Sequence, residues 1–283
     1  METQKLILVQ SGNLNVGECP VWEERTGTLL LLDITGKCVW KLDPASGKSE
    51  RIPTPQQIGC MAICENGDLL LALEDAVYRR GADGTLKKAH QDIKIKGRRF
   101  NDGKVGPDGA FYLGTTDSGG NGAFYRLKDG ILTELFDCCC CSNGIEWTGD
   151  GRHMYYIDSL RHMVELFDFD AETGTLSDRR KFLDIPEPWG LPDGMTLDEN
   201  DDLWVALWNG HRVIHFDAGK KEVVGEIQVP CPKASCCAFG GKDRNELYIT
   251  TAAMDDGKDY PAAGNTFKAI LNVRGRRVRY YQG

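Results

Sequence analysis

The sequence predicts an all-β protein, specifically a six-bladed β-propeller, on three observations. Short strand-like runs such as TLLLLDI, HMYYIDS and DLWVALW dominate the chain, and long helical periodicity is hard to find. Turn pairs such as Asn66-Gly67, Asp108-Gly109 and Asp150-Gly151 separate these runs. The same order of strands and turns recurs along the chain with a period of about 40 to 50 residues, which is typical of four-stranded propeller blades.

Six repeat units result when each unit is aligned on one position of its first strand. Consecutive aligned positions are 41, 42, 42, 50 and 42 residues apart. We assign the longer step to an extra loop with the sequence LSDRRKFLDIPEPWG. The aligned residues are Glu18, Gly59, Asn101, Asn143, Asp193 and Ser235. We therefore expect one propeller domain spanning residues 1–283.

The two ends of the chain indicate how the ring of blades closes. KLILVQ near the N-terminus reads as a strand, and so do TFKAILNV and RVRYYQ near the C-terminus. We expect the N-terminal strand to pair with one of the two in a shared blade, because this pairing removes an exposed sheet edge.

The six aligned residues predict a ring around a central channel, since the innermost strand of each blade lines the propeller axis. Four of the six carry a side-chain carbonyl or carboxylate oxygen. Oxygen donors at equal blade spacing suit a hard divalent cation on the axis. The alternative is a polar channel filled with bound water.

Charge and composition exclude several other classes of protein. The net charge of −8 argues against a nucleic-acid binder and against a polybasic membrane anchor. No run approaches 18 apolar residues, so we expect no transmembrane helix. The N-terminal apolar stretch is too short for a signal-peptide core, which favours a cytoplasmic protein.

The eleven cysteines do not predict a disulfide framework, because their number is odd and no secretion signal accompanies them. The run Cys138 to Cys141 contains a formal C-x-x-C. Neighbours in a strand alternate between faces, so four consecutive thiolates cannot reach one metal. We expect these cysteines to act as small buried hydrophobic residues, and the five histidines to be structural or superficial.

Five motifs carry a family resemblance: NVGECPVW, RRFNDGKVGPDGAFYLGT, SNGIEW, LPDGMTLDENDDLWVALW and ASCCAFGGKDRNELYITTA. In this order they resemble the senescence-marker-30/gluconolactonase/luciferin-regenerating family, whose members are six-bladed. The resemblance implies a single divalent metal held by Glu18, Asn143 and Asp193. It also implies that Arg99 and Asn101 contact the substrate. We interpret Asp102, between Asn101 and a glycine, as a turn-forming acid.

The resemblance favours a metal-dependent hydrolase that opens a sugar-acid lactone. The metal would polarise the lactone carbonyl, and Asp193 would be both a ligand and a general base for the attacking water. The sequence contains no G-x-S-x-G nucleophile motif. Oxygen ligands favour Ca²⁺, Mg²⁺ or Mn²⁺, while Zn²⁺ and Fe²⁺ are compatible with them.

Three other functions stay open at this point. The same ring could hydrolyse a phosphotriester or an apolar lactone in a pocket lined by Trp189, Trp208 and Phe100. A calcium-binding regulatory propeller without turnover is a second alternative, and a redox sensor built on the cysteine run is a third. We expect a small-molecule lactone as partner, no nucleic acid or membrane, and a monomer or weak dimer.

Overall fold

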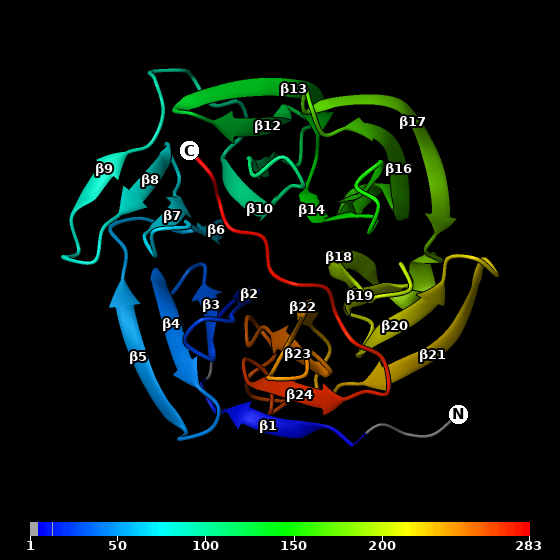
Figure 1. The fold of residues 1–283 in the computed structure, drawn as a ribbon. Coiled ribbons are helices and arrows are strands. Elements are labelled where there is room, and N and C mark those ends of the chain that lie inside the picture. Colours follow the sequence, from blue (N-terminus) through cyan, green and yellow to red (C-terminus); the bar gives the residue numbers. More distant parts are fainter. Residues whose placement is uncertain (1–4, 13) are drawn as a thin grey trace.

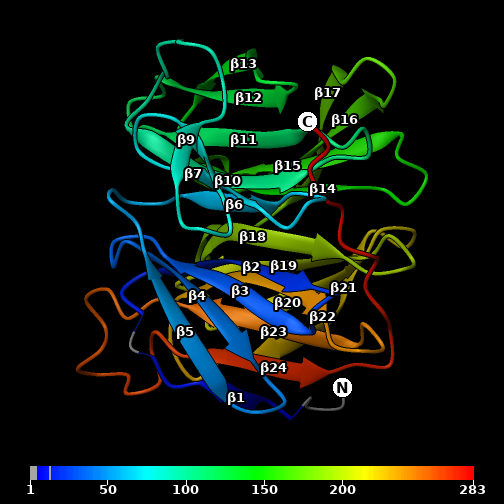
Figure 2. The ribbon, with the colours of Figure 1, turned by 60° about the vertical axis from the view of Figure 1, so that its left-hand side comes forward.

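The predicted fold class is confirmed. A computed structural model describes residues 5–12 and 14–283, in which six four-stranded antiparallel sheets stand around a common axis as propeller blades (Figures 1 and 2). No helix in the described part of the chain is long and apolar enough to cross a bilayer. The domain bounds of 1 and 283 stay a prediction, and residues 1–4 lie outside the described residues.

The blades follow one another in sequence order, and each begins with its innermost strand. The first three blades are β2 (Gly17–Glu23), β3 (Thr28–Asp33), β4 (Cys38–Asp43) and β5 (Lys48–Pro53); β6 (Cys60–Ile63), β7 (Leu69–Ala72), β8 (Val77–Arg80) and β9 (Leu86–Lys88); and β10 (Arg99–Val105), β11 (Phe111–Thr116), β12 (Gly122–Lys128) and β13 (Ile131–Cys139). The next two are β14 (Ser142–Trp147), β15 (His153–Asp158), β16 (Met163–Asp170) and β17 (Thr175–Asp184); and β18 (Leu191–Leu197), β19 (Leu203–Trp208), β20 (Arg212–Asp217) and β21 (Glu222–Gln228). Two short 3₁₀ turns, η1 (Ser159–Arg161) and η2 (Glu187–Trp189), lie between strands.

The sixth blade closes the ring with strands from both ends of the chain. It contains β22 (Ala234–Gly240), β23 (Glu246–Thr251), β24 (Thr266–Ile270) and, as its outer strand, β1 (Ile7–Gln10). β1 pairs antiparallel with β24, so the expected pairing of KLILVQ with TFKAI is confirmed. β1 therefore covers the edge that β24 would otherwise expose.

The other C-terminal run, RVRYYQ, does not join a blade. Residues 275–283 form an extended segment that crosses the centre of the ring in Figure 1. The Tyr281 N–H donates to the Ile63 carbonyl (2.8 Å), and the Val278 N–H donates to Glu24 Oε1 (3.3 Å). Both acceptors lie at or just after the end of an innermost strand, so this segment covers the channel mouth at which those strands end.

Two further expectations need correction. Most of the supposed extra loop between Asn143 and Asp193 is strand, because β17 continues to Asp184 and only η2 follows it. The cysteine run is not uniformly buried: Cys139 is buried, Cys140 and Cys141 are half-buried, and Cys138 is exposed. β13 is the outer strand of its blade, so no further sheet covers Cys138 within it, and Cys140 and Cys141 lie beyond its end at Cys139.

Candidate active site

The six aligned residues lie where the innermost strands begin, and five of them coincide with a β-bulge. The pairing register shifts at the residues of the ring in β2, β10, β14, β18 and β22, whereas β6 pairs regularly with β7. A bulge places an extra residue on one strand and redirects its side chain. The repeated bulges thus explain how successive blades present one polar side chain each at the same mouth of the channel.

The two ring positions without a large polar side chain have structural roles. A Cβ atom on Gly59 would lie 2.1 Å from the Phe100 carbonyl oxygen, so only glycine permits β10 to approach the second blade this closely. The Ser235 hydroxyl donates to the Gly17 carbonyl (2.5 Å), which joins the sixth blade to the first. The remaining four positions hold the oxygen donors.

A chain of hydrogen bonds connects the third, fourth and fifth blades across the mouth. Arg99 Nη1 donates to Asn101 Oδ1 (2.7 Å), and Asn101 Nδ2 donates to Asn143 Oδ1 (2.7 Å). Asn143 Nδ2 donates to the Ser159 hydroxyl (2.6 Å), which in turn donates to the Pro192 carbonyl (2.6 Å). The chain fixes the orientation of both amides, and it leaves a lone pair of Asn143 Oδ1 available for a further partner.

Two buried carboxylates complete the ring. Glu18 and Asp193 are 8% and 6% exposed, and among the described residues neither forms a salt bridge with a cationic side chain. Burial, reinforced by the charge of Asp102, raises the pKa of Glu18 to about 8. Burial and the charge of Glu18 raise the pKa of Asp193 well above its ordinary value, although Arg99 acts in the opposite direction. The protein thus buries two carboxyl groups here without a salt-bridge partner among the described residues, so that ionising them is costly.

This donor set fits a divalent cation. Two carboxylates would balance a 2+ charge, and the Asn143 amide oxygen would supply a third, neutral ligand from the neighbouring blade. An unpaired buried carboxylate is costly, and a bound cation would remove that cost. The charge of Glu18 acts on Asp193, and Asn101 is hydrogen-bonded to Asn143. That Glu18, Asn143 and Asp193 hold an ion stays a prediction.

Arg99 lies at the same mouth, as the sequence predicted. Its Nη1 atom makes two hydrogen bonds, to Asn101 Oδ1 and to the Phe100 carbonyl (2.8 Å). Burial lowers the pKa of the guanidinium, which stays charged at neutral pH. Nε and Nη2 have no hydrogen-bond partner among the described residues, so they are available to an oxygen-rich ligand.

The layer directly below the ring was misread in the sequence. Asp102 lies within β10, not in a turn, and its exposed surface faces a cavity of about 100 Å³ in the channel. The sulfur-bearing residues Cys19, Cys60 and Cys236 occupy the corresponding positions of three other blades and are buried. The N-D-G sequence is typical of a turn, and the bulge at this point accommodates it inside a strand instead.

Further along the channel the polar groups are paired. Lys104 Nζ lies 2.8 Å from Glu146 Oε2 and donates to the Met195 carbonyl (3.0 Å). Arg279, from the C-terminal segment, reaches Glu146 Oε1 at 3.3 Å. The lower half of the channel therefore carries neutralised charge and is closed by the chain itself.

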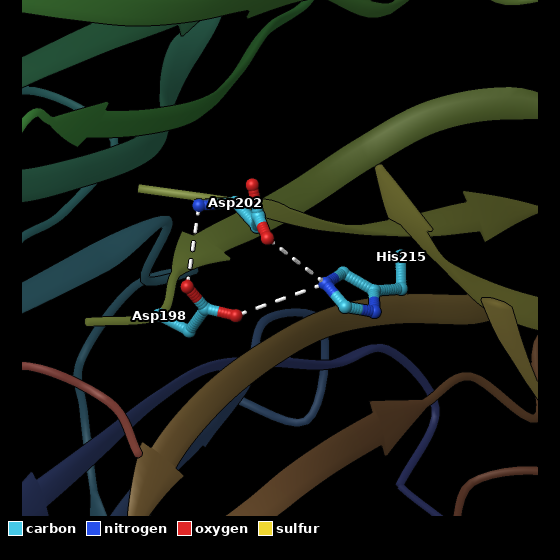
Figure 3. A group of neighbouring side chains, drawn as sticks. All are labelled: Asp198, Asp202 and His215. Atoms are coloured by element: carbon cyan, nitrogen blue, oxygen red, sulfur yellow. Dashed lines mark hydrogen bonds and ion pairs between the residues drawn. The ribbon is translucent and has the colours of Figure 1, made fainter. Parts of the chain in front are cut away.

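Sequence reasoning missed two other features. The Cys141 thiol lies beside the ring: Asn143 Nδ2 is 3.6 Å from its sulfur, and burial raises the pKa of this thiol to about 11. A second group of possible metal ligands, Asp198, Asp202 and His215, gathers in the fifth blade (Figure 3). The search for His–His pairs could not reveal this group, because its single histidine converges with two aspartates.

The apolar wall proposed for the phosphotriester alternative is not formed as expected. Phe100 is fully buried in the core between blades, where its ring packs edge-on against Tyr125 with centroids 6.1 Å apart. Its side chain therefore points away from the channel mouth, and its backbone carbonyl alone contacts Arg99. This removes one of the three residues on which that alternative depended.

Fold and site together define the class of protein: a six-bladed propeller with an axial set of oxygen donors at one mouth. Residues 16–253 match the family model described as SMP-30/Gluconolactonase/LRE-like region. The chain belongs to the SMP-30/gluconolactonase/LRE-like family, and the resemblance seen in the motifs is confirmed.

Similar proteins cover nearly the whole chain. It is 36% identical to regucalcin from Xenopus laevis, with 97% of each chain aligned. It is also 36% identical to a Bacillus subtilis (strain 168) protein named "Putative sugar lactone lactonase YvrE", with 92% of each chain aligned. The crystal structure of a regucalcin from Agrobacterium tumefaciens, titled a calcium-binding protein, superposes with a TM-score of 0.93 at 26% identity over the full length of both chains.

Proposed function

We propose that this protein is a divalent-metal-dependent hydrolase that opens sugar-acid lactones. The observation that carries the proposal is the pair of buried, unneutralised carboxylates, Glu18 and Asp193, beside the free donors of Arg99. The family and the lactonase name of the Bacillus subtilis relative support it. A site that only bound an ion would not need a guanidinium with unused donors beside it.

In this proposal Glu18, Asn143 and Asp193 hold the ion, which would supply Lewis-acid polarisation of the lactone carbonyl and stabilise the oxyanion that develops. Arg99 offers its Nε and Nη2 groups to the hydroxyl or carboxylate oxygens of the substrate. Asn101 orients the Asn143 amide and limits the directions in which that oxygen can accept.

Asp193 has a second task. One of its two oxygens would ligate the ion, and the other would accept the proton of a water that attacks the lactone carbonyl. Arg99 lowers the pKa of Asp193, and a bound cation would act in the same direction, so the carboxylate would be ionised and able to take that proton. The ring oxygen of the lactone leaves as an alcohol, which gives the open-chain acid.

The test is proton release from a panel of aldonolactones, followed with a pH indicator. EDTA-stripped protein is assayed with added Ca²⁺, Mg²⁺, Mn²⁺, Zn²⁺ or Fe²⁺. We expect metal-dependent turnover that falls about a thousandfold or more in Asp193→Ala, since loss of the ion removes several kcal/mol of transition-state stabilisation. Asp92→Ala, which alters an exposed carboxylate far from the ring, is the matched control.

Arg99→Met separates a lactonase from an ion-binding propeller without turnover. The variant should bind the metal with unchanged stoichiometry and hydrolyse the lactone far more slowly, because it loses the substrate contact together with the hydrogen bond that orients Asn101. Ion binding without hydrolysis of any lactone in the panel would overturn the proposal and favour the calcium-binding alternative.

A further inference from the structure

A second cluster of candidate ligands lies in the fifth blade, at the far end of the strand that carries Asp193. Asp198 directly follows β18, Asp202 directly precedes β19, and His215 lies in β20. Asp198 is five positions after Asp193, which corresponds to roughly 16 Å along a strand. The cluster is therefore distinct from the ring and lies toward the mouth that the C-terminal segment covers.

The three side chains converge on one point (Figure 3). His215 Nε2 lies 3.7 Å from Asp198 Oδ2 and 3.6 Å from Asp202 Oδ2. Both separations are too long for good hydrogen bonds. Two ligand atoms that each lie 2.0–2.1 Å from a tetrahedral ion are about 3.4 Å apart, which is close to both distances. The spacing is therefore that of atoms on either side of an ion.

The imidazole nitrogen that lies between the two carboxylates lacks a bonding partner. His215 Nε2 is buried and has no hydrogen-bond partner among the described residues. Asp198 is fully buried, and the side chain of Asp202 is 17% exposed. A neutral imidazole would direct either a lone pair toward two anionic oxygens or an N–H toward acceptors beyond its reach. A cation shared by the three atoms satisfies all of them.

The two carboxylates are held in place by the surrounding backbone. Asp198 Oδ1 accepts from the Asn200 N–H (2.8 Å) and the Asp202 N–H (3.2 Å). Asp202 Oδ1 accepts from the Ala218 N–H (2.9 Å). In each aspartate the other oxygen, Oδ2, is the one that faces His215. Hydrogen bonds to the outer oxygens of ligating carboxylates are the usual support of a metal site.

Trp204 supports both kinds of ligand. Its indole stacks on the His215 ring with centroids 4.1 Å apart and an interplanar angle of 11°, and its Nε1 donates to Asp198 Oδ2 (3.2 Å). The stacking fixes the plane of the imidazole, and the hydrogen bond fixes the carboxylate. Both groups are thus ordered before any ion binds.

We propose that Asp198, Asp202 and His215 form a second metal site, selective for a divalent first-row transition ion such as Zn²⁺. Two carboxylates neutralise the ion, the imidazole supplies a third ligand, and a water would complete a four-coordinate site. The nitrogen ligand and the low ligand number disfavour Ca²⁺, which takes six to eight oxygen ligands. This proposal does not depend on the lactonase activity.

The ion would tie the β18–β19 turn to β20, and that turn also holds the C-terminal segment. Asp198 forms a β-bridge with Gly275, and Asp201 Oδ1 lies 2.7 Å from Arg276 Nη2. The site would therefore stabilise the part of the fifth blade on which the segment rests. Its role would be structural, because Asp193 and the open mouth of the channel lie at the other end of β18.

The test counts the zinc ions bound by the full-length chain. EDTA-stripped protein is dialysed to equilibrium against buffered Zn²⁺, and bound zinc is measured by mass spectrometry. We expect Asp202→Asn and His215→Gln to bind one ion fewer than the wild type, or to bind it more than about tenfold more weakly. His211→Gln changes a neighbouring histidine outside the cluster and should bind zinc as the wild type does. Asp193→Asn should retain the ion of the fifth blade.

A second measurement uses the stacked indole. Ni²⁺ quenches nearby tryptophans, so its addition should reduce tryptophan fluorescence in the wild type and in Asp193→Asn, and much less in Asp202→Asn and in Trp204→Phe. Near-ultraviolet circular dichroism of each variant verifies that the fold is retained. Unchanged zinc stoichiometry and affinity in both Asp202→Asn and His215→Gln would overturn the proposal. A wild type whose bound zinc is lost entirely in Asp193→Asn would overturn it as well.

Discussion

The two ends of the central channel contain similar side chains in opposite electrostatic states. At the open mouth, Glu18 is buried without a salt bridge to a cationic side chain among the described residues. At the covered end, Glu146 is also mostly buried, but Lys104 and Arg279 lie within 2.8 and 3.3 Å of its oxygens. The two glutamates occupy innermost strands of the same propeller, so the fold alone does not determine their state.

The pKa values move in opposite directions for this reason. Burial dominates at Glu18 and raises its pKa to about 8. Burial also opposes ionisation of Glu146, yet Lys104 and Arg279 outweigh it and lower its pKa. Burial of a carboxylate is therefore a weak indication of function, whereas burial without a compensating charge points to a missing cation.

The largest expected effect is on the pH dependence of stability in the metal-free protein. A carboxyl group whose folded pKa is raised binds more protons in the folded than in the unfolded state between its two pKa values. The free energy of unfolding should therefore increase as the pH falls from about 8 to about 5, by on the order of 3 kcal/mol for Glu18. Urea unfolding in EDTA at several pH values measures this change.

Glu18→Gln isolates the contribution of that carboxylate, because the amide does not titrate. The increase in the free energy of unfolding on lowering the pH should be smaller in this variant, and also in the wild type saturated with the divalent ion. Glu146 does not oppose the trend in this range, since a carboxylate with a lowered pKa loses its stabilising effect only below its unfolded pKa of about 4.5. If the free energy of unfolding depended on pH equally in the wild type and in Glu18→Gln, ionisation of Glu18 would not be what destabilises the metal-free protein.

Lys104→Met should have the next largest effect on the free energy of unfolding. At pH 8 it should destabilise the protein, whereas Glu18→Gln should stabilise the metal-free protein. Removing the ammonium leaves Glu146 buried with Arg279 as its remaining cation. Loss of one partner of a fully buried pair costs about 3–5 kcal/mol, and we expect about 2 kcal/mol here because the Lys104 side chain is a third exposed. Denaturant unfolding at pH 8 measures it, and adding Glu146→Gln should recover part of the loss. An unchanged midpoint for Lys104→Met would contradict the comparison.

The sequence predicted the blade number and the ring of polar residues because both follow from a strict period. One residue per unit, 41 or 42 positions apart in four of five steps, must occupy equivalent positions when the units are related by rotation about one axis. The ring closure through β1 and β24 followed from the need to protect a sheet edge. Local pattern and global fold agree at these positions.

Other features depend on contacts that no local pattern encodes. Asp102 was interpreted as a turn residue because N-D-G favours turns, but a bulge keeps it in β10. RVRYYQ alternates like a strand, yet it lies across the covered mouth because β24 already pairs with β1. Asp198, Asp202 and His215 converge only because β19 and β20 form a hairpin, which brings residue 215 back to the turn.

The smallest expected effect tests whether the C-terminal segment contributes to the pairing at the covered end. Arg279 Nη1 lies 3.3 Å from Glu146 Oε1, and the guanidinium lies 6.0 Å from the centre of the Trp147 ring. Lys104 still neutralises Glu146 in Arg279→Ala, so we expect a loss of less than about 1 kcal/mol in the free energy of unfolding. Arg277→Ala is the matched control, because that side chain is 77% exposed and its ion pair with Glu24 should contribute almost nothing. A loss in Arg279→Ala as large as that in Lys104→Met would mean that the segment, and not the propeller alone, maintains the neutral end of the channel.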